Sequence, residues 1–131
     1  MKSENKAHYW DIAAGYDYET AKVLLEAKKY FYIGFMCHQT IEKILKALLE
    51  KRCEDRAAPF SQNLNLLVKD AGIYEELTEA QRGILDRLEK LYNEAGYPSA
   101  KSEMLSELDY ERCGEIINET EGLYLWIKKQ L

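Results

Sequence analysis

Residues 36–48 read Met-Cys-His-Gln-Thr-Ile-Glu-Lys-Ile-Leu-Lys-Ala-Leu, and this stretch decides the expected fold. Its apolar side chains recur at intervals of three and four residues, which is the period of a helix with one buried side. The apolar stripe of a helix over about 30–52 would contain Ile33, Cys37, Ile41, Ile44, Leu45 and Leu48. A second face collects four polar side chains at i, i+3, i+4 and i+7: Gln39, Glu42, Lys43 and Lys46. This polar face has two interpretations, a solvated surface or a ligand-binding surface.

Helical patterns continue on both sides of this segment. We predict further helices over about 5–28, over about 62–70, from Thr78 to about 95, and from Ser106-x-x-Asp109 towards the end of the chain. No segment has the alternating pattern of a strand. The sequence therefore predicts an all-α fold, an up-down bundle of four main helices and one short helix, in a single domain spanning residues 1–131.

Helix-end signals support these boundaries. Thr78 and Gln81 have the spacing of a capping box, in which each side chain bonds the backbone N–H of the other residue. Gly72 and Gly96 follow helical patterns, where a left-handed residue commonly ends a helix. Ten tyrosines and two tryptophans, many at helical spacing, predict an aromatic-rich core.

Composition limits the classes of function. The net charge of −5 argues against broad, non-specific binding to nucleic acid. The first residues are polar and carry no secretory signal, and no run approaches the roughly 18 apolar residues of a membrane span, so we expect no membrane association. The three cysteines form no CxxC pair, which favours a reducing, cytoplasmic location.

Common catalytic and cofactor motifs are missing. The chain has no GxxxxGK[ST], GxGxxG, GxSxG or HExxH sequence, and we expect no cofactor and no metal. Cys37 precedes His38, but adjacent helical side chains point about 100° apart, so a cysteine nucleophile is not favoured. His38 and Glu42 form an i, i+4 pair, which supplies only half of a metal site.

Asp17 is the exception on the apolar stripe of the first helix. A buried, unpaired carboxylate costs several kcal/mol, so Asp17 either finds a cation or lies at the solvated rim of the stripe. Lys43 and Lys46 are the candidate partners, because a short connection makes the first two helices antiparallel neighbours.

Four segments together resemble the HEPN domain family. Asp17 lies at the place of the usual acidic residue of the first helix, and 37–49 contains His-Gln, Glu-Lys and Leu-Lys-Ala in the family's order. Ser-Gln-Asn-Leu at 61–64 is similar to Thr-His-Asn-Leu, and Tyr-Asn-Glu-Ala-Gly-Tyr-Pro at 92–98 is similar to Tyr-x-x-Ala-Arg-Tyr-Pro. The resemblance extends from about Trp10 to Ile127.

This resemblance implies a dimeric helical bundle with a cleft between the second and fourth helices. Many members of the family pair with a small nucleotidyltransferase in toxin–antitoxin systems, and some are metal-independent ribonucleases with an Arg-x4–6-His motif. That motif is absent here, because the first arginine is Arg52 and both histidines, His8 and His38, precede it. Gly96 and Gln62 also replace an arginine and a histidine of the family patterns.

The main hypothesis is a binding module rather than an enzyme. Its candidate ligand-binding residues are Asp17, His38, Gln39, Glu42, Lys43, Lys46, Tyr92 and Tyr97, with no catalytic residue assigned. The expected partners are a second copy of the chain, a nucleotidyltransferase, and a nucleotide or RNA ligand. One alternative is a divergent ribonuclease toxin that uses His38, and another is a protein with a purely structural role in binding other proteins.

Overall fold

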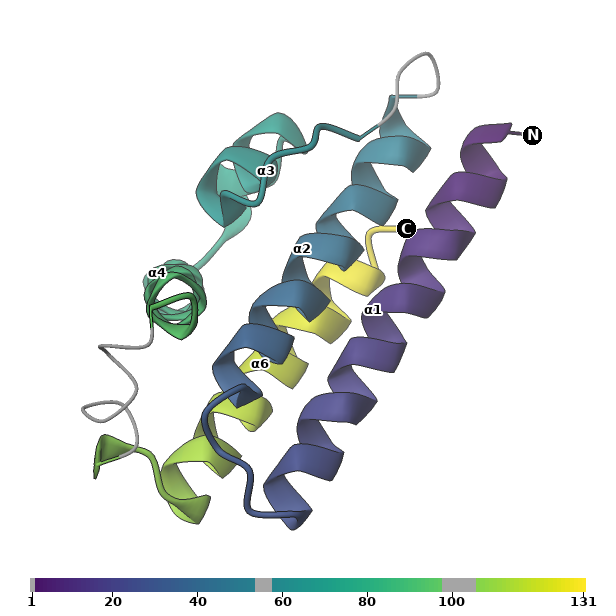
Figure 1. The fold of residues 1–131 in the computed structure, drawn as a ribbon. Helices are drawn as coiled ribbons and strands as arrows, with labels where there is room; N and C mark the ends of the chain where they lie inside the picture. The colour runs from purple at the N-terminus through teal and green to yellow at the C-terminus, as the bar shows by residue number, and fades with distance from the viewer. Residues whose placement is uncertain (1, 54–57, 98–105) are drawn as a thin grey trace.

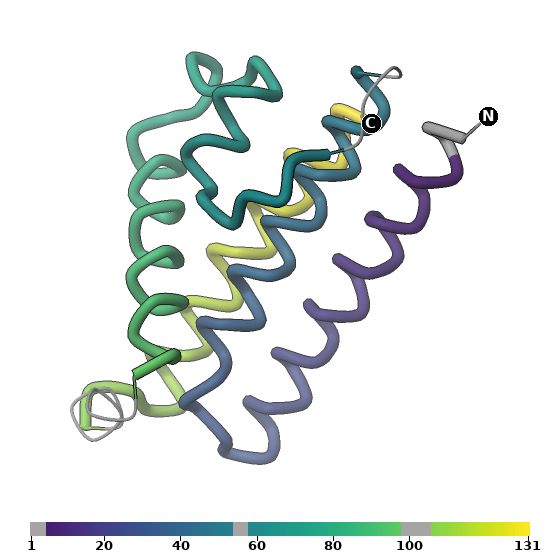
Figure 2. Tube along the Cα trace, turned by 45° about the horizontal axis from the view of Figure 1, so that its top comes forward, coloured from purple at the N-terminus to yellow at the C-terminus, as the bar shows by residue number. Residues whose placement is uncertain are grey.

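The structure is a computed structural model that describes residues 2–53, 58–97 and 106–131. Its elements are α1 (Lys2–Glu26), α2 (Ile33–Arg52), α3 (Leu64–Asp70), the short 3-10 helix η1 (Tyr74–Glu76), α4 (Glu79–Ala95) and α6 (Tyr110–Lys128). All of these elements are helical, which confirms the predicted all-α bundle. Successive long helices alternate in direction, and α4 is steeply inclined to the other three (Figures 1 and 2). The segments between the predicted helices around residues 53–60 and after Tyr97 lie partly outside the described residues.

Helix α2 lies at the centre of the bundle. It contacts α1, α3, α4 and α6, and Figure 1 shows it between α1 on one side and α3 and α4 on the other. The whole predicted apolar stripe is buried: Ile33, Cys37, Ile41, Ile44, Leu45 and Leu48. Because neighbours cover several sides of α2, its polar residues are also drawn into the interior.

Most predicted helix ends agree with the structure. Thr78 and Gln81 form the predicted capping box before α4, and Asp109 caps α6 by accepting the N–H of Arg112 at 2.7 Å. Gly72 adopts a left-handed backbone, with φ of 74°. The prediction for Gly96 is wrong, because this residue stays in the right-handed helical region with φ of −80°.

A lysine ends the first helix in place of a glycine. Lys28 has φ of 59°, and the N–H groups of Lys28 and Lys29 donate back to the carbonyls of Leu25 and Leu24. This is the Schellman arrangement, which satisfies carbonyls at the helix end. Helix α2 then begins at Ile33, later than the predicted start near residue 30.

Close contact between α2 and α4 depends on Gly34. A Cβ atom placed on Gly34 would lie 2.7 Å from the Cβ of Leu91, which is too short for two carbon atoms. The missing side chain therefore lets α4 cross α2 near its first turn. This crossing positions Tyr92, one residue further along α4, over the rings of α2.

The predicted aromatic-rich core is only partly present. Among the described tyrosine, tryptophan and phenylalanine side chains, Tyr18, Phe31 and Tyr124 are buried, and Trp10, Tyr30, Tyr74 and Trp126 pack against the core, which consists mainly of isoleucine, leucine and alanine. Several aromatic side chains are instead exposed: Tyr9, Tyr16, Tyr32, Phe60, Tyr97 and Tyr110. A tyrosine hydroxyl needs a polar partner when buried, whereas an aliphatic side chain needs none.

A candidate binding cleft between helices α2 and α4

His38 is fully buried on the side of α2 that faces α4. Its ring stacks on the ring of Tyr92, with centroids 4.0 Å apart and planes at 17°. Burial is the main cause that lowers the pKa of His38 to about 4, and the charge of Lys46 lowers this pKa further. The Gln39 side chain and the Gln62 backbone act in the opposite direction. At neutral pH the imidazole is therefore uncharged.

Both ring nitrogens of His38 lack a hydrogen bond of ordinary geometry among the described residues. Nδ1 lies 3.7 Å from Oε1 of Glu42, which exceeds hydrogen-bond distance. The Oε1 atoms of Glu42 and Gln39 are likewise buried without a hydrogen bond. Because buried polar atoms are normally paired, these atoms mark a place where a partner is missing.

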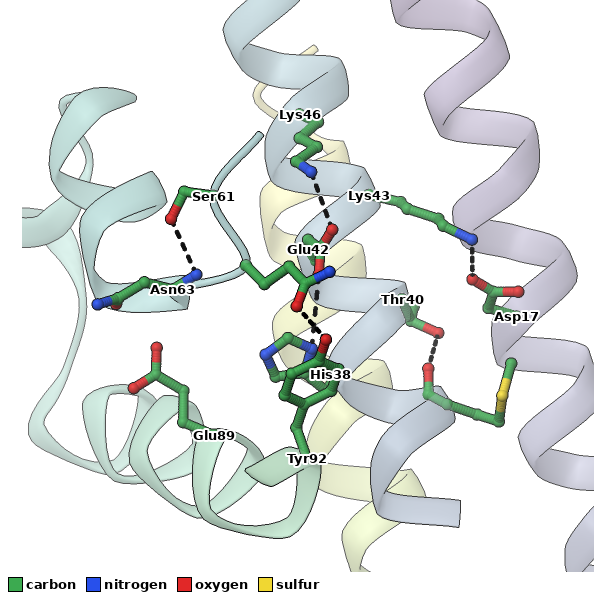
Figure 3. A network of polar contacts seen from close by, with 12 residues as sticks. Asp17, His38, Thr40, Glu42, Lys43, Lys46, Ser61, Asn63, Glu89 and Tyr92 are labelled. Atoms are coloured by element: carbon green, nitrogen blue, oxygen red, sulfur yellow. Dashed lines mark hydrogen bonds and ion pairs between the residues drawn. The ribbon is translucent and has the colours of Figure 1, made fainter. Parts of the chain in front are cut away.

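The polar face of α2 is largely covered by its neighbours: Glu42 and Lys46 are buried, and Gln39 and Lys43 are half-buried (Figure 3). Nζ of Lys46 donates to Oε2 of Glu42 at 2.9 Å, and the two side chains are only 8% and 6% exposed. Lys46 also lies over the ring of Trp10 on α1, 5.3 Å from its centroid. The charge of Lys46 is therefore already matched inside the protein.

Asp17 and Lys43 form a second ion pair, which joins α1 to α2 (Figure 3). The distance from Nζ of Lys43 to Oδ2 of Asp17 is 2.5 Å, and the carboxylate is nearly buried. Of the two alternatives for Asp17, a cation partner or the solvated rim of the stripe, the structure shows the cation partner. A hollow of about 330 Å³ beside this pair is lined mostly by apolar side chains of α1.

A polar cleft of about 230 Å³ opens beside His38. It lies between α2, the segment that leads into α3, and α4. Its lining side chains are His38, Gln62, Asn63, Glu89, Tyr92 and Asn93. These residues come from segments far apart in the sequence, so only the folded chain assembles the cleft.

Hydrogen bonds hold the walls of this cleft in place. The hydroxyl of Tyr92 donates to Oε1 of Gln62, and Oδ1 of Asn63 caps α3 by accepting the N–H of Leu66 at 3.1 Å. Oε1 of Glu89 accepts the N–H of Asn65 at 3.2 Å. Helices α3 and α4 are thereby fixed against each other, and the cleft is preorganised.

An aromatic hollow of about 400 Å³ adjoins the cleft. The two spaces share Tyr92 and Asn93 as lining residues. Tyr32 and Tyr97 also line the hollow and are 52% and 64% exposed. Tyr92 itself stacks on Phe35 as well as on His38, so the exposed ring faces of the hollow are those of Tyr32 and Tyr97.

The structure separates the predicted site residues into groups. His38 and Tyr92 line the cleft. Glu42, Lys46 and half-buried Gln39 lie next to His38 on α2 and are not among the described residues that line it. Tyr97 lies in the adjoining hollow. Asp17 and Lys43 belong to a different flank of α2 and line neither the cleft nor the hollow.

Four lining residues were missing from the predicted site: Gln62, Asn63, Glu89 and Asn93. Three of them lie in the segments 61–64 and 92–98, which carry the family resemblance, so these segments were the available signal. Nothing in the sequence marked Glu89 as a site residue, because a carboxylate on the polar side of a helix is usually solvated.

Nucleophilic and metal chemistry receive no support from the described part of the chain. Burial raises the pKa of the Cys37 thiol to about 12 and that of Cys113 to about 11, so both thiols are protonated at neutral pH. No three side chains of His, Cys, Asp or Glu gather as metal ligands among the described residues. None of the described helices is long and apolar enough to span a membrane.

Comparison with known proteins identifies the family. Residues 7–130 match the HEPN domain, so the chain belongs to the HEPN domain family. The chain is similar in fold to the protein TT1696 from Thermus thermophilus, with a TM-score of 0.81 and 18% sequence identity over 97% of this chain and 99% of that one. No curated protein matches the sequence.

Proposed function

We propose that this protein is a binding module that holds a nucleotide or the end of an RNA strand in the cleft and the adjoining hollow. The observation that carries the proposal is the uncharged, fully buried His38, whose ring nitrogens lack a hydrogen bond of ordinary geometry among the described residues, at the wall of a preorganised polar cleft. Tyr32 and Tyr97 supply exposed ring faces in the adjoining hollow, against which the part of the ligand outside the cleft can pack.

The residues of the cleft favour binding over cleavage. General acid catalysis at neutral pH is favoured by a group that is protonated there, and an imidazole with a pKa of about 4 is almost entirely in its neutral form. The described side chains that line the cleft include no arginine or lysine to stabilise charge on a phosphate. With the absent Arg-x4–6-His motif, these features support a HEPN protein that does not cut RNA.

The proposal includes partners of the kind that the family implies. HEPN domains commonly dimerise, and a second copy of this chain is the first expected partner. A small nucleotidyltransferase is the second, in a toxin–antitoxin-like pair inside the cytoplasm. Exposed aromatic side chains on α1, such as Tyr9 and Tyr16, provide apolar surface for these contacts. Size-exclusion chromatography with light scattering tests the dimer, and a monomer at micromolar concentration contradicts it.

A thermal-shift screen with ATP, GTP and short RNA tests the binding function. A ligand at about 100 times its Kd stabilises the folded chain by roughly 2.7 kcal/mol, which raises Tm by roughly 5–10 °C. The variant Tyr97→Ala loses most of this shift, whereas Tyr110→Ala, another exposed tyrosine that lines neither the cleft nor the adjoining hollow, keeps it. The proposal fails if no ligand raises Tm. RNA cleavage that disappears in His38→Ala would favour the ribonuclease alternative.

A further inference from the structure

The electrostatics of the cleft indicate which part of a nucleotide enters it. Glu89 is the one charged side chain among the described residues that line the cleft, and its charge is negative. The nearby cations do not offset it, since Lys46 is paired with Glu42 and Lys43 with Asp17. A phosphate in this space would meet a carboxylate and no free cation, which is an unfavourable arrangement.

The hydrogen-bonding groups of the cleft are complementary to a neutral, planar ligand. Gln62 and Asn63 already use their amide oxygens, for the Tyr92 hydroxyl and the Leu66 N–H, so their NH2 groups remain as donors. Glu89 has acceptor capacity beyond its bonds to Asn65, because a carboxylate offers about four lone-pair sites. The cleft therefore presents donors on the side of Gln62 and Asn63 and an acceptor at Glu89.

We infer that the cleft binds the base of a nucleotide, with guanine as the best match, and leaves the phosphates outside. Guanine carries two adjacent donors, N1–H and N2–H2, which suit the Glu89 carboxylate, and its O6 and N7 acceptors suit amide NH2 groups. His38 forms a buried part of the wall, and its ring nitrogens have no exposed surface, so the polar contacts to the base come from Gln62, Asn63 and Glu89. This inference rests on the proposed function and specifies the orientation of the ligand.

Isothermal titration calorimetry with guanosine, GMP, GTP and inorganic phosphate tests the orientation. We expect guanosine and GTP to bind with Kd values within about threefold of each other, and Kd to change little between 50 and 200 mM salt. Affinity that rises at least tenfold from guanosine to GTP and falls steeply with salt would mean phosphate recognition, and would overturn the inference. Binding of GTP or RNA without binding of guanosine overturns the inference alone. If none of these ligands binds, both proposals fail.

Base identity is tested with adenosine and with a matched pair of variants. We expect adenosine to bind at least tenfold more weakly than guanosine, and equal or tighter binding of adenosine overturns the assignment to guanine. Glu89→Gln removes the carboxylate and weakens guanosine binding about tenfold. Glu94→Gln makes the same change on α4 but lines a different hollow, so it leaves guanosine affinity unchanged. If Glu89→Gln and Glu94→Gln bind guanosine with equal affinity, the proposed contact between Glu89 and the base is contradicted.

A second variant separates binding from folding, because Glu89 also bonds Asn65 of α3. Asn93 lines the cleft and is exposed on α4. Asn93→Ala should weaken guanosine binding severalfold while the Tm of the unliganded protein stays within about 1 °C of wild type, as is usual for exposed substitutions. The inference is overturned if Asn93→Ala leaves guanosine affinity unchanged and Glu89→Gln loses guanosine affinity only together with a lower Tm. Glu89 would then have a structural role.

Discussion

The two flanks of α2 both carry buried ionisable side chains, but they differ in how completely these side chains are paired. Towards α1, Lys43 and Asp17 form a closed ion pair, with a distance of 2.5 Å between Nζ and Oδ2. Towards α4, His38 and Glu42 keep buried polar atoms without hydrogen bonds beside an open cleft. A buried group that is fully paired contributes to the architecture, whereas a buried group without a partner indicates a site for a ligand.

Removing Glu42 gives the largest expected effect on this comparison. In Glu42→Ala the ammonium of Lys46, only 8% exposed, loses its counterion, and we expect the free energy of unfolding to fall by about 3–5 kcal/mol. Urea denaturation measures the change. The double variant Glu42→Leu with Lys46→Met should recover most of the loss, because no uncompensated charge remains. A loss below about 1 kcal/mol in the single variant would mean that solvent reaches this pair.

The pKa of His38 predicts how stability depends on pH. This pKa is about 4 in the folded chain and 6.5 in the ordinary, unfolded state, so the unfolded chain takes up its proton first as pH falls. The free energy of unfolding is therefore highest above pH 6.5 as far as His38 is concerned. It decreases by about 3 kcal/mol in total as pH falls from 6.5 to about 4. Urea denaturation of wild type and His38→Gln at several pH values isolates this contribution. Parallel curves for the two proteins between pH 7 and 4 would contradict the low pKa.

Gly34→Ala tests whether the close approach of α4 to α2 maintains the cleft. The added Cβ would meet Leu91 at 2.7 Å, so we expect a loss of about 1–3 kcal/mol and weaker ligand binding as α4 shifts. Gly83→Ala is the matched control, since a Cβ atom at Gly83 of α4 meets nothing within 4 Å. That variant should be unchanged or more stable by up to about 1 kcal/mol. Equal Tm values for both variants would show that the contact tolerates a methyl group.

Lys43→Met should give the smallest loss in the free energy of unfolding, and it tests the ion pair on the flank of α2 that faces α1. The Lys43 side chain is 23% exposed, so water screens part of the ion pair and can solvate Asp17 when the lysine is removed. We expect a loss of about 1 kcal/mol by urea denaturation, clearly less than for Glu42→Ala. A loss as large as that of Glu42→Ala would place both ion pairs in the same buried environment.

Most of the fold was predictable from local signals. The period of the apolar residues located the helices, and the capping box of Thr78 marked the start of α4. The predicted start of the last helix at Ser106 is too early, because Asp109 caps α6, which begins at Tyr110. The errors concern features that depend on distant contacts. Gly96 lacks the left-handed backbone that its position predicted, and tyrosines at helical spacing point mostly outward.

The candidate site was predictable only in part. The sequence singled out His38, Tyr92 and Tyr97, which line the cleft or its adjoining hollow, and it also singled out Glu42 and Lys46, which form an ion pair behind His38 on α2. It also grouped Asp17 and Lys43 with them, although these two residues form a separate ion pair. Residues at i, i+3 and i+4 share a helical face, but that spacing does not say which neighbouring helix will cover each part of the face.

The sequence by itself determined the helices, the buried stripe of α2 and the absence of an Arg-x4–6-His motif. Only the tertiary structure decided that the polar face of α2 is buried, that Lys43 pairs with Asp17, and that Gln62, Asn63, Glu89 and Asn93 converge on His38. The physical reason is range: a helix forms through bonds between residues four positions apart, whereas burial and charge pairing depend on segments that folding brings together.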